Sequence, residues 1–268
     1  MSKGALLTGT VGGIMGAVTA VFGIVWVFVH VIFSNEIVSY CSMLSNYLIG
    51  MIYPDFPRFY ALSQYPIPYF PSASLFGVAS FILAMLLIVT GILFGLGFYG
   101  TYKIGGGIMG VVGLASSVKG MVAGALLIIV GNLTTGYVYA YTLVEMASVP
   151  FYPVTTPNFV VMWIGFIVLG VTCIILGSAS MRVREMTEKP SAFYAAGTLS
   201  ILCAVDFIAG GLVNIVGGHT MGGLLRLLGL MNQLREGSSL AGIYIIGFAL
   251  IFIAFILWAW AFYSSRSL

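Results

Sequence analysis

Six long apolar blocks divide this chain, and only 6% of its 268 residues are charged. A helix needs about 20 apolar residues to cross the hydrocarbon core of a bilayer, which is roughly 30 Å thick. Chains that fold in water carry about 25% charged residues. The pattern therefore predicts an all-α polytopic membrane protein that forms a single membrane domain over residues 1–268. We expect its six transmembrane helices at residues 9–33, 75–99, 105–131, 158–181, 192–216 and 240–263.

The third helix has two alternative starts. Residues 104–144 form one weakly polar stretch with Lys119 inside it, so the helix begins either near Gly105 or after Lys119. The pentapeptide Gly-Gly-Ile-Met-Gly occurs at residues 12–16, in the first helix, and again at residues 106–110. Glycine-rich membrane helices also resemble one another through composition alone, but a repeated segment indicates a repeated structural unit. We therefore favour the start near Gly105 and expect three tandem helical hairpins.

The basic residues predict the orientation, because loops on the cytoplasmic side of a membrane carry an excess of Lys and Arg. With the N-terminus inside, the cytoplasmic side has twice as many of these cations as the outer side. We therefore expect a multi-pass protein of the cell membrane with both termini in the cytoplasm. The inner cations are Lys3, Lys103, Arg182, Arg184, Lys189 and Arg266, and the outer ones are Arg58, Arg226 and Arg235.

Two segments on the outer side have distinctive compositions. Residues 34–74 hold five prolines and nine Tyr or Phe residues, so we expect a folded external loop that covers the helix ends or docks on a partner. Residues 221–236 mix leucines with Arg226, Asn232 and Arg235, and are too short and too charged to span. We expect there an amphipathic helix that lies on the membrane surface.

Two charged residues fall inside the predicted crossings at the same depth. Lys119 and Asp206 each lie about 14 residues from the inner start of their helix, and therefore roughly 21 Å deep. An unpaired charge at the bilayer centre costs about 2.5–3.5 kcal/mol. Because their charges are opposite, we predict an intramembrane ion pair between Lys119 and Asp206. The pair would be a structural lock or one station of a proton or ion path.

Eight glycines form four pairs with a spacing of four residues. This spacing places both members on one helix face, where they let neighbouring backbones approach closely. Glycine is also frequent in membrane helices generally, which is the alternative explanation of the pairs. We predict helix-packing contacts, inside the chain or between subunits, at Gly12, Gly16, Gly91, Gly95, Gly106, Gly110, Gly120 and Gly124.

His30 and His219 are the two histidines of the chain, and both lie near the outer ends of predicted helices. Imidazole is the commonest metal ligand in proteins and an axial ligand of haem. Neither histidine has a carboxylate or thiol neighbour in the sequence, so we expect interfacial histidines and predict no metal or cofactor. Haem ligation by His30 and His219 is the alternative.

Six helices in three hairpins are also the arrangement of the mitochondrial carriers, but their Pro-x-Asp/Glu-x-x-Lys/Arg signature is absent from the sequence. In general texture, the glycine-rich helices with many Val, Ile and Tyr resemble uncharacterised polytopic membrane proteins of thermophilic archaea. No specific motif carries this resemblance, and it implies no function.

Three classes of function remain. A non-catalytic membrane subunit or scaffold fits the aromatic loop and the glycine faces, which would contact protein partners or a second copy. A small transporter or channel would use Asp206 and Lys119, and a haem- or quinone-linked anchor would depend on the histidines. Because few polar residues fall inside the crossings, we favour the subunit and predict no catalytic residue. The net charge of +3 is too small and too scattered to indicate nucleic-acid binding.

Overall fold

The computed structural model describes residues 2–52, 71–138, 154–183, 190–219 and 238–267. Within these ranges, six helices are long and apolar enough to cross a membrane, as the sequence predicts. Such a set of helices is that of a multi-pass membrane protein. The spans are Lys3–Phe33, Ser72–Gly105, Gly107–Leu133, Phe159–Val183, Ser191–Ile215 and Tyr244–Ser264.

Four of the spans lie within one helix each, the second continues from a helix into the π-helical segment η1 (Tyr102–Gly106), and the third is built from three elements. The helices of the first, second, fourth, fifth and sixth spans are α1 (Ser2–Ile52), α3 (Pro71–Thr101), α6 (Phe159–Val183), α7 (Pro190–His219) and α10 (Ser238–Ser264). The third span consists of α4 (Gly107–Ala115), the π-helical turn η2 (Ser116–Gly120) and α5 (Met121–Leu133). It begins close to the earlier of the two predicted starts, so Lys119 lies inside it.

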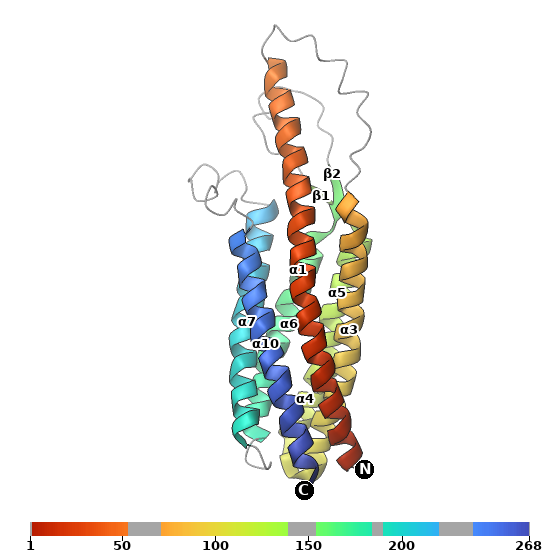
Figure 1. The fold of residues 1–268 in the computed structure, drawn as a ribbon, viewed down its shortest axis with the longest axis vertical. Helices are drawn as coiled ribbons and strands as arrows, with labels where there is room; N and C mark the ends of the chain where they lie inside the picture. The colour runs from red at the N-terminus through yellow and green to blue at the C-terminus, as the bar shows by residue number, and fades with distance from the viewer. Residues whose placement is uncertain (1, 53–70, 139–153, 184–189, 220–237, 268) are drawn as a thin grey trace.

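The spans form a closed ring in which consecutive helices of the chain are neighbours. α1 packs on α3, α3 on the third span, the third span on α6, and α6 on α7. α7 packs in turn on α10, and α10 closes the ring by packing on α1. Because the number of antiparallel spans is even, both termini lie at the same end of the bundle (Figure 1).

Consecutive glycines make the turn between α3 and the third span. The φ angles of Gly105 and Gly107 are 107° and 56°, which are values that residues with a Cβ rarely adopt. Because glycine adopts them freely, the chain reverses here within the short segment η1 (Tyr102–Gly106) and the residue that follows it. α3 and the third span consequently pack side by side directly from the turn.

α1 is longer than the sequence indicates. It does not end at residue 33 but continues to Ile52, because the first helix-breaking proline is Pro54. The predicted external loop 34–74 therefore begins as a helix. Glu36 links this extension to α3, since its Oε2 accepts hydrogen bonds from the hydroxyl of Ser72 at 2.6 Å and from the N–H of Ser72 at 3.3 Å.

A short antiparallel β ribbon is a second difference, because the sequence predicts helices alone. β1 (Thr135–Val138) follows the third span and pairs with β2 (Val154–Pro157), which precedes α6. Thr, Val and Tyr favour strands, and they dominate this ribbon. The amphipathic helix expected at residues 221–236 lies outside the described residues.

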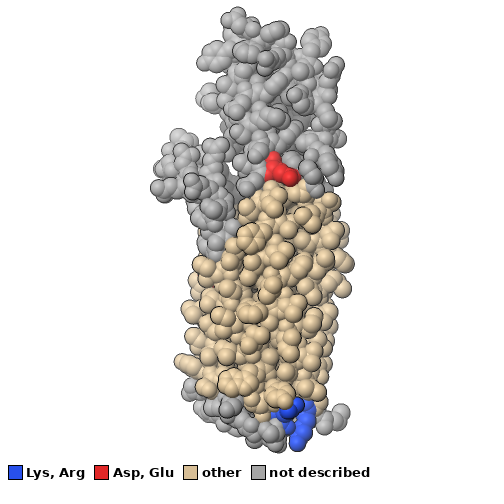
Figure 2. All heavy atoms as spheres, viewed as in Figure 1, with Lys and Arg blue, Asp and Glu red and all other residues tan. Residues whose placement is uncertain are grey.

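The face of the ring that Figure 2 shows is apolar in its middle and charged at its ends. Figure 2 shows a described band without acidic or basic side chains, with Lys and Arg at the end that holds the termini. At this end, Nζ of Lys103 lies 5.3 Å from the ring centre of Tyr99, and the guanidinium carbon of Arg266 lies 3.6 Å from that of Tyr263. Tyrosines beside basic residues are typical of the membrane–water interface.

Glycines lie where neighbouring helices approach one another most closely. A methyl group at Gly12 would lie 2.7 Å from Cα of Phe94 in α3, and one at Gly91 would lie 2.7 Å from the carbonyl oxygen of Ser117. Contacts this short are repulsive, so a larger side chain would push the helices apart. The surroundings of Gly106 lie outside the description. The other predicted packing glycines all lie at contacts of this kind: Gly12, Gly16, Gly91, Gly95, Gly110, Gly120 and Gly124.

Aromatic side chains fill the inside of the ring, which we call the lumen. In the half nearer the termini, the ring centre of Phe94 lies 4.9 Å from that of Trp258 and 5.3 Å from that of Phe255. In the other half, the ring centres of Trp26 and Phe166 are 5.0 Å apart. These contacts connect helices that are not neighbours in the ring, because α3 meets α10 and α1 meets α6. The lumen is therefore a packed core.

Two tryptophan N–H groups in the lumen donate to serine hydroxyls. Nε1 of Trp26 donates to Oγ of Ser80 over 2.9 Å, and Nε1 of Trp258 donates to Oγ of Ser180 over 2.8 Å. The hydroxyl of Ser180 donates onward to the carbonyl oxygen of Phe193 over 2.7 Å. All these side chains are fully buried, so each hydrogen bond satisfies a polar group that has no access to water.

We predict that Gly107→Ala destabilises the protein by about 1–3 kcal/mol, because an alanine cannot adopt this backbone conformation without strain. Nothing lies within 4 Å of the added methyl group, so the effect comes from the backbone alone. The measurement is the free energy of unfolding in mixed detergent micelles. Gly4→Ala is the matched control, since Gly4 also has open space but lies in a regular helix. Equal effects of the two substitutions would contradict this account of the turn.

We predict that Ser180→Ala lowers the free energy of unfolding by about 1 kcal/mol, because it leaves the Nε1–H of Trp258 without an acceptor in an apolar core. Ser178→Ala on the exposed face of the same helix is the control, and we expect no measurable change there. A Ser180→Ala protein as stable as the control would show that the hydrogen bond contributes nothing.

Candidate functional site

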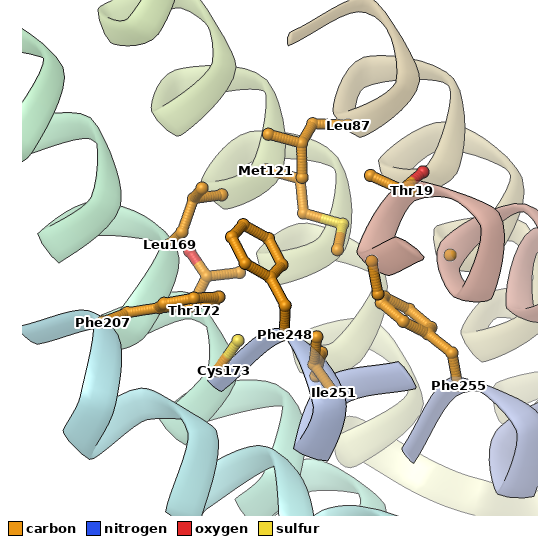
Figure 3. A pocket seen from close by; sticks show the side chains of 12 residues that line it. Thr19, Leu87, Met121, Leu169, Thr172, Cys173, Phe207, Phe248, Ile251 and Phe255 are labelled. Carbon is orange, nitrogen blue, oxygen red and sulfur yellow. The ribbon is translucent and has the colours of Figure 1, made fainter. Parts of the chain in front are cut away.

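A small cavity lies in the middle of the lumen, and its volume is about 30 Å³. Figure 3 shows the side chains that surround it, among which Phe248 of α10 reaches toward Met121 of the third span. All six spans contribute to the wall, which makes this cavity the natural place to look for a path or a ligand. One residue from each span in chain order is Thr19, Leu87, Met121, Leu169, Phe207 and Phe248.

The polar groups at the cavity wall already have partners. Oγ1 of Thr19 donates to the carbonyl oxygen of Met15 over 2.8 Å and lies 2.9 Å from Oγ1 of Thr90. The hydroxyl of Thr172 donates to the carbonyl oxygen of Val168 over 2.8 Å. A cavity holds water when it presents two or more unsatisfied polar groups, and apolar cavities stay dry. The centre of the lumen therefore has the character of an apolar packing gap.

His30 lies inside the ring among four aromatic side chains. Its ring is parallel to that of Trp26 at 5.4 Å and lies 5.1 Å from Trp163, 5.5 Å from Phe76 and 5.8 Å from Phe159, measured between ring centres. His30 is half-buried, and its imidazole packs against this aromatic group.

His219 is the last residue of α7, and its side chain lies outside the description. Among the residues described here, no three His, Cys, Asp or Glu side chains come together in a group that could hold a metal ion. Cys173 and Cys203 are buried free thiols on α6 and α7.

Lys119 lies on the outer face of the third span. Ser117 and Met121 form the buried inner face, whereas Lys119 is exposed. Exposed positions recur every three or four residues from Ile108, which is 71% exposed, to Leu133, which is 77% exposed, and Lys119 lies near their centre. The third span is also the least covered of the six, because 33% of its apolar segment is buried compared with 44–50% in the others.

Asp206 lies on α7 at the seam between α7 and α10. A methyl group at Gly247 of α10 would lie 3.1 Å from Cβ of Asp206. Asp206 is half-buried, and its Oδ2 is a buried atom that has no hydrogen-bond partner in the described structure. The adjacent Val205 is 60% exposed, so the carboxyl group lies close to the outer edge of the seam.

The two charged residues lie at similar depths in the bundle. Gly120, next to Lys119, packs on Thr172 of α6, and the α7 segment around Asp206 packs on Gly170 of α6. Thr172 and Gly170 are two residues apart on one helix, which corresponds to about 3 Å along the axis. The levels of Lys119 and Asp206 therefore agree within about one helical turn.

The structure nevertheless does not bring Lys119 and Asp206 together within one chain. The third span and α7 pack on opposite sides of α6, and Asp206 faces α10. Lys119 faces outward. The ion pair therefore stays a prediction from the sequence.

Two residues that sequence reasoning missed are Ala115 and Ala123. Both are exposed, and they lie four residues before and after Lys119 on the same face of the third span. The signal was present in the sequence as small residues at a spacing of four around a cation. A search restricted to glycine pairs does not find it.

A packed lumen and two charges near the outer surface are thus the features from which a function can be inferred. No protein-family model, no curated protein and no solved structure matches this chain.

Proposed function

We propose that this protein is a non-catalytic integral membrane subunit or scaffold that acts through its outer surface. The observation that carries the proposal is the position of Lys119, which is exposed in the middle of a span. Charged residues within membranes almost always face a bundle interior, a water-filled cavity or an opposite charge. A cation on the outer face therefore requires a partner in the membrane that supplies the missing contact.

The lumen supports the same proposal against a transporter or channel. Transporters bind their substrates near the bilayer midplane, at sites formed by polar side chains and exposed backbone groups. At this level the lumen contains Phe207 and Phe248, and the hydroxyls of Thr19 and Thr172 already have partners. The charges that a path would use lie at the outside of the ring.

The proposed orientation has both termini in the cytoplasm of a cell with this protein in its cell membrane. Lys3, Lys103, Arg182 and Arg266 lie at the ends of α1, α3, α6 and α10 that share the side of the termini. An excess of such residues is typical of the cytoplasmic side. The order of helices around the ring also supports three tandem hairpins, because the two helices of each proposed hairpin pack side by side.

Purification from native membranes in a mild detergent, together with reconstitution into liposomes, tests the proposed function. We expect the wild-type chain to purify in a defined assembly with other chains or with further copies. Liposomes that contain it should show no proton or ion flux above that of protein-free liposomes. Asp206→Asn removes the carboxylate with little change in shape, and we expect the same baseline flux.

A flux that the wild-type protein supports and Asp206→Asn abolishes would contradict the proposal. A chain that is monomeric in native membranes would contradict it as well, because a subunit needs a partner. Cross-linking in intact membranes, before any detergent is added, shows whether the chain is a monomer there. It therefore separates true monomers from complexes that the detergent disrupts.

A further inference from the structure

We propose that the partner on the outer face is a second copy of this chain, with Lys119 of one copy paired to Asp206 of the next copy inside the membrane. The inference rests on the proposed function and deepens it, because it names what the outer surface binds.

Lys119 lies too deep to reach water along its own helix. It comes twelve residues after Gly107 and fourteen before Leu133, which is about 18 Å and 21 Å from the two ends of the span. Lysines near helix ends extend to the membrane surface, but a four-carbon side chain does not cover this distance. An ammonium group exposed to hydrocarbon has a large solvation cost, and contact with an anion reduces it.

Asp206 supplies that anion. It is the one Asp or Glu within the six described spans, so these spans offer no other carboxylate. Its Oδ2 has no hydrogen-bond partner in the described structure, which leaves an acceptor unsatisfied within the membrane. The two groups match in sign and, within about one helical turn, in level. They lie on different sides of the ring, so one pair joins two copies.

The surfaces around the two charges allow helices to approach. Ala115 and Ala123 flank Lys119, and small residues at this spacing let a neighbouring helix come close in lipid. On the other surface, where α7 meets α10, Val205 is 60% exposed and Ile246 is 56% exposed. Because the two surfaces differ, the contact is head-to-tail, and it links copies into a closed ring or an open row.

Charge reversal tests the pairing. Energy transfer between two labelled populations of the full chain in phosphatidylcholine vesicles reports self-association at set protein-to-lipid ratios. Lys119→Asp places two acids at the contact, and Asp206→Lys places two cations there. We expect each variant alone to associate at least about tenfold more weakly than wild type, because an unpaired charge is left in the interface.

Mixing the two variants should restore association. The acid introduced by K119D in one chain then meets the cation introduced by D206K in the other. The mixture should grow beyond pairs, as wild-type chains do, because its two remaining surfaces carry Asp206 of the K119D chain and Lys119 of the D206K chain, which repeat the native contact.

Cysteine cross-linking covers the case in which a reversed charge prevents folding. In a background without the three native cysteines, chains with one tag carry Lys119→Cys and chains with a second tag carry Asp206→Cys. Oxidation should join the two tags. Ile108→Cys replaces Lys119→Cys in the control, because this position is exposed on the same span but lies near its end, and no cross-link to Asp206→Cys is expected.

Wild-type chains that stay monomeric at every ratio, or charge-reversed chains that associate as wild type does, would overturn the pairing. If a different protein co-purifies in equal amount and cross-links to Lys119→Cys, the second-copy inference fails while the proposed subunit function stands. If the copies pair as inferred and the assembly conducts ions, the proposed function fails while the pairing stands.

Discussion

Close packing of helix backbones at small residues holds this fold together. Transfer of an apolar side chain from hydrocarbon to the protein interior gains no hydrophobic free energy, so helix association depends on packing. At three seams glycine meets glycine: Gly9 with Gly97, Gly124 with Gly165, and Gly177 with Gly197. At each contact the two helices gain more dispersion energy from each other than either would gain from a flexible lipid tail. The narrow seams draw the six spans into a tight ring, and large aromatic rings then fill the space that remains inside it.

The crossings could be predicted from the sequence because length and hydropathy are direct consequences of bilayer thickness. The third span needed more than hydropathy, and the repeated pentapeptide at residues 106–110 indicated its start. Outside the bilayer, its thickness no longer constrains the length or composition of a segment. The extension of α1 to Ile52 and the β ribbon at Thr135–Val138 were missed, because several local structures satisfy a water-exposed backbone equally well.

For the two charged residues, the sequence predicts the depth in the membrane but not the direction in which each side chain points. Depth follows from counting residues, so the sequence could place Lys119 and Asp206 at one level. Direction requires a polar and an apolar face, and the third span has no continuous polar face, because its polar residues are Ser116, Ser117, Lys119 and Asn132. Its inner face is set by contacts such as Gly120 on Thr172, which hydropathy cannot reveal. Within one chain, Lys119 therefore lies on the outer face of the third span, whereas Asp206 lies half-buried at the seam between α7 and α10.

Closure of the ring between the first and last helices has a consequence for biosynthesis. Every other seam joins helices that are consecutive in the chain, so each can form as soon as its second helix enters the membrane. The face of α1 that receives α10, which includes Gly13 and Gly16, has no protein neighbour until the final span is made. Insertion of α10 is thus the step that encloses the lumen. A nascent chain halted before α10 presents an open aromatic trough to the lipid, and a quality-control protease or chaperone can recognise such a surface.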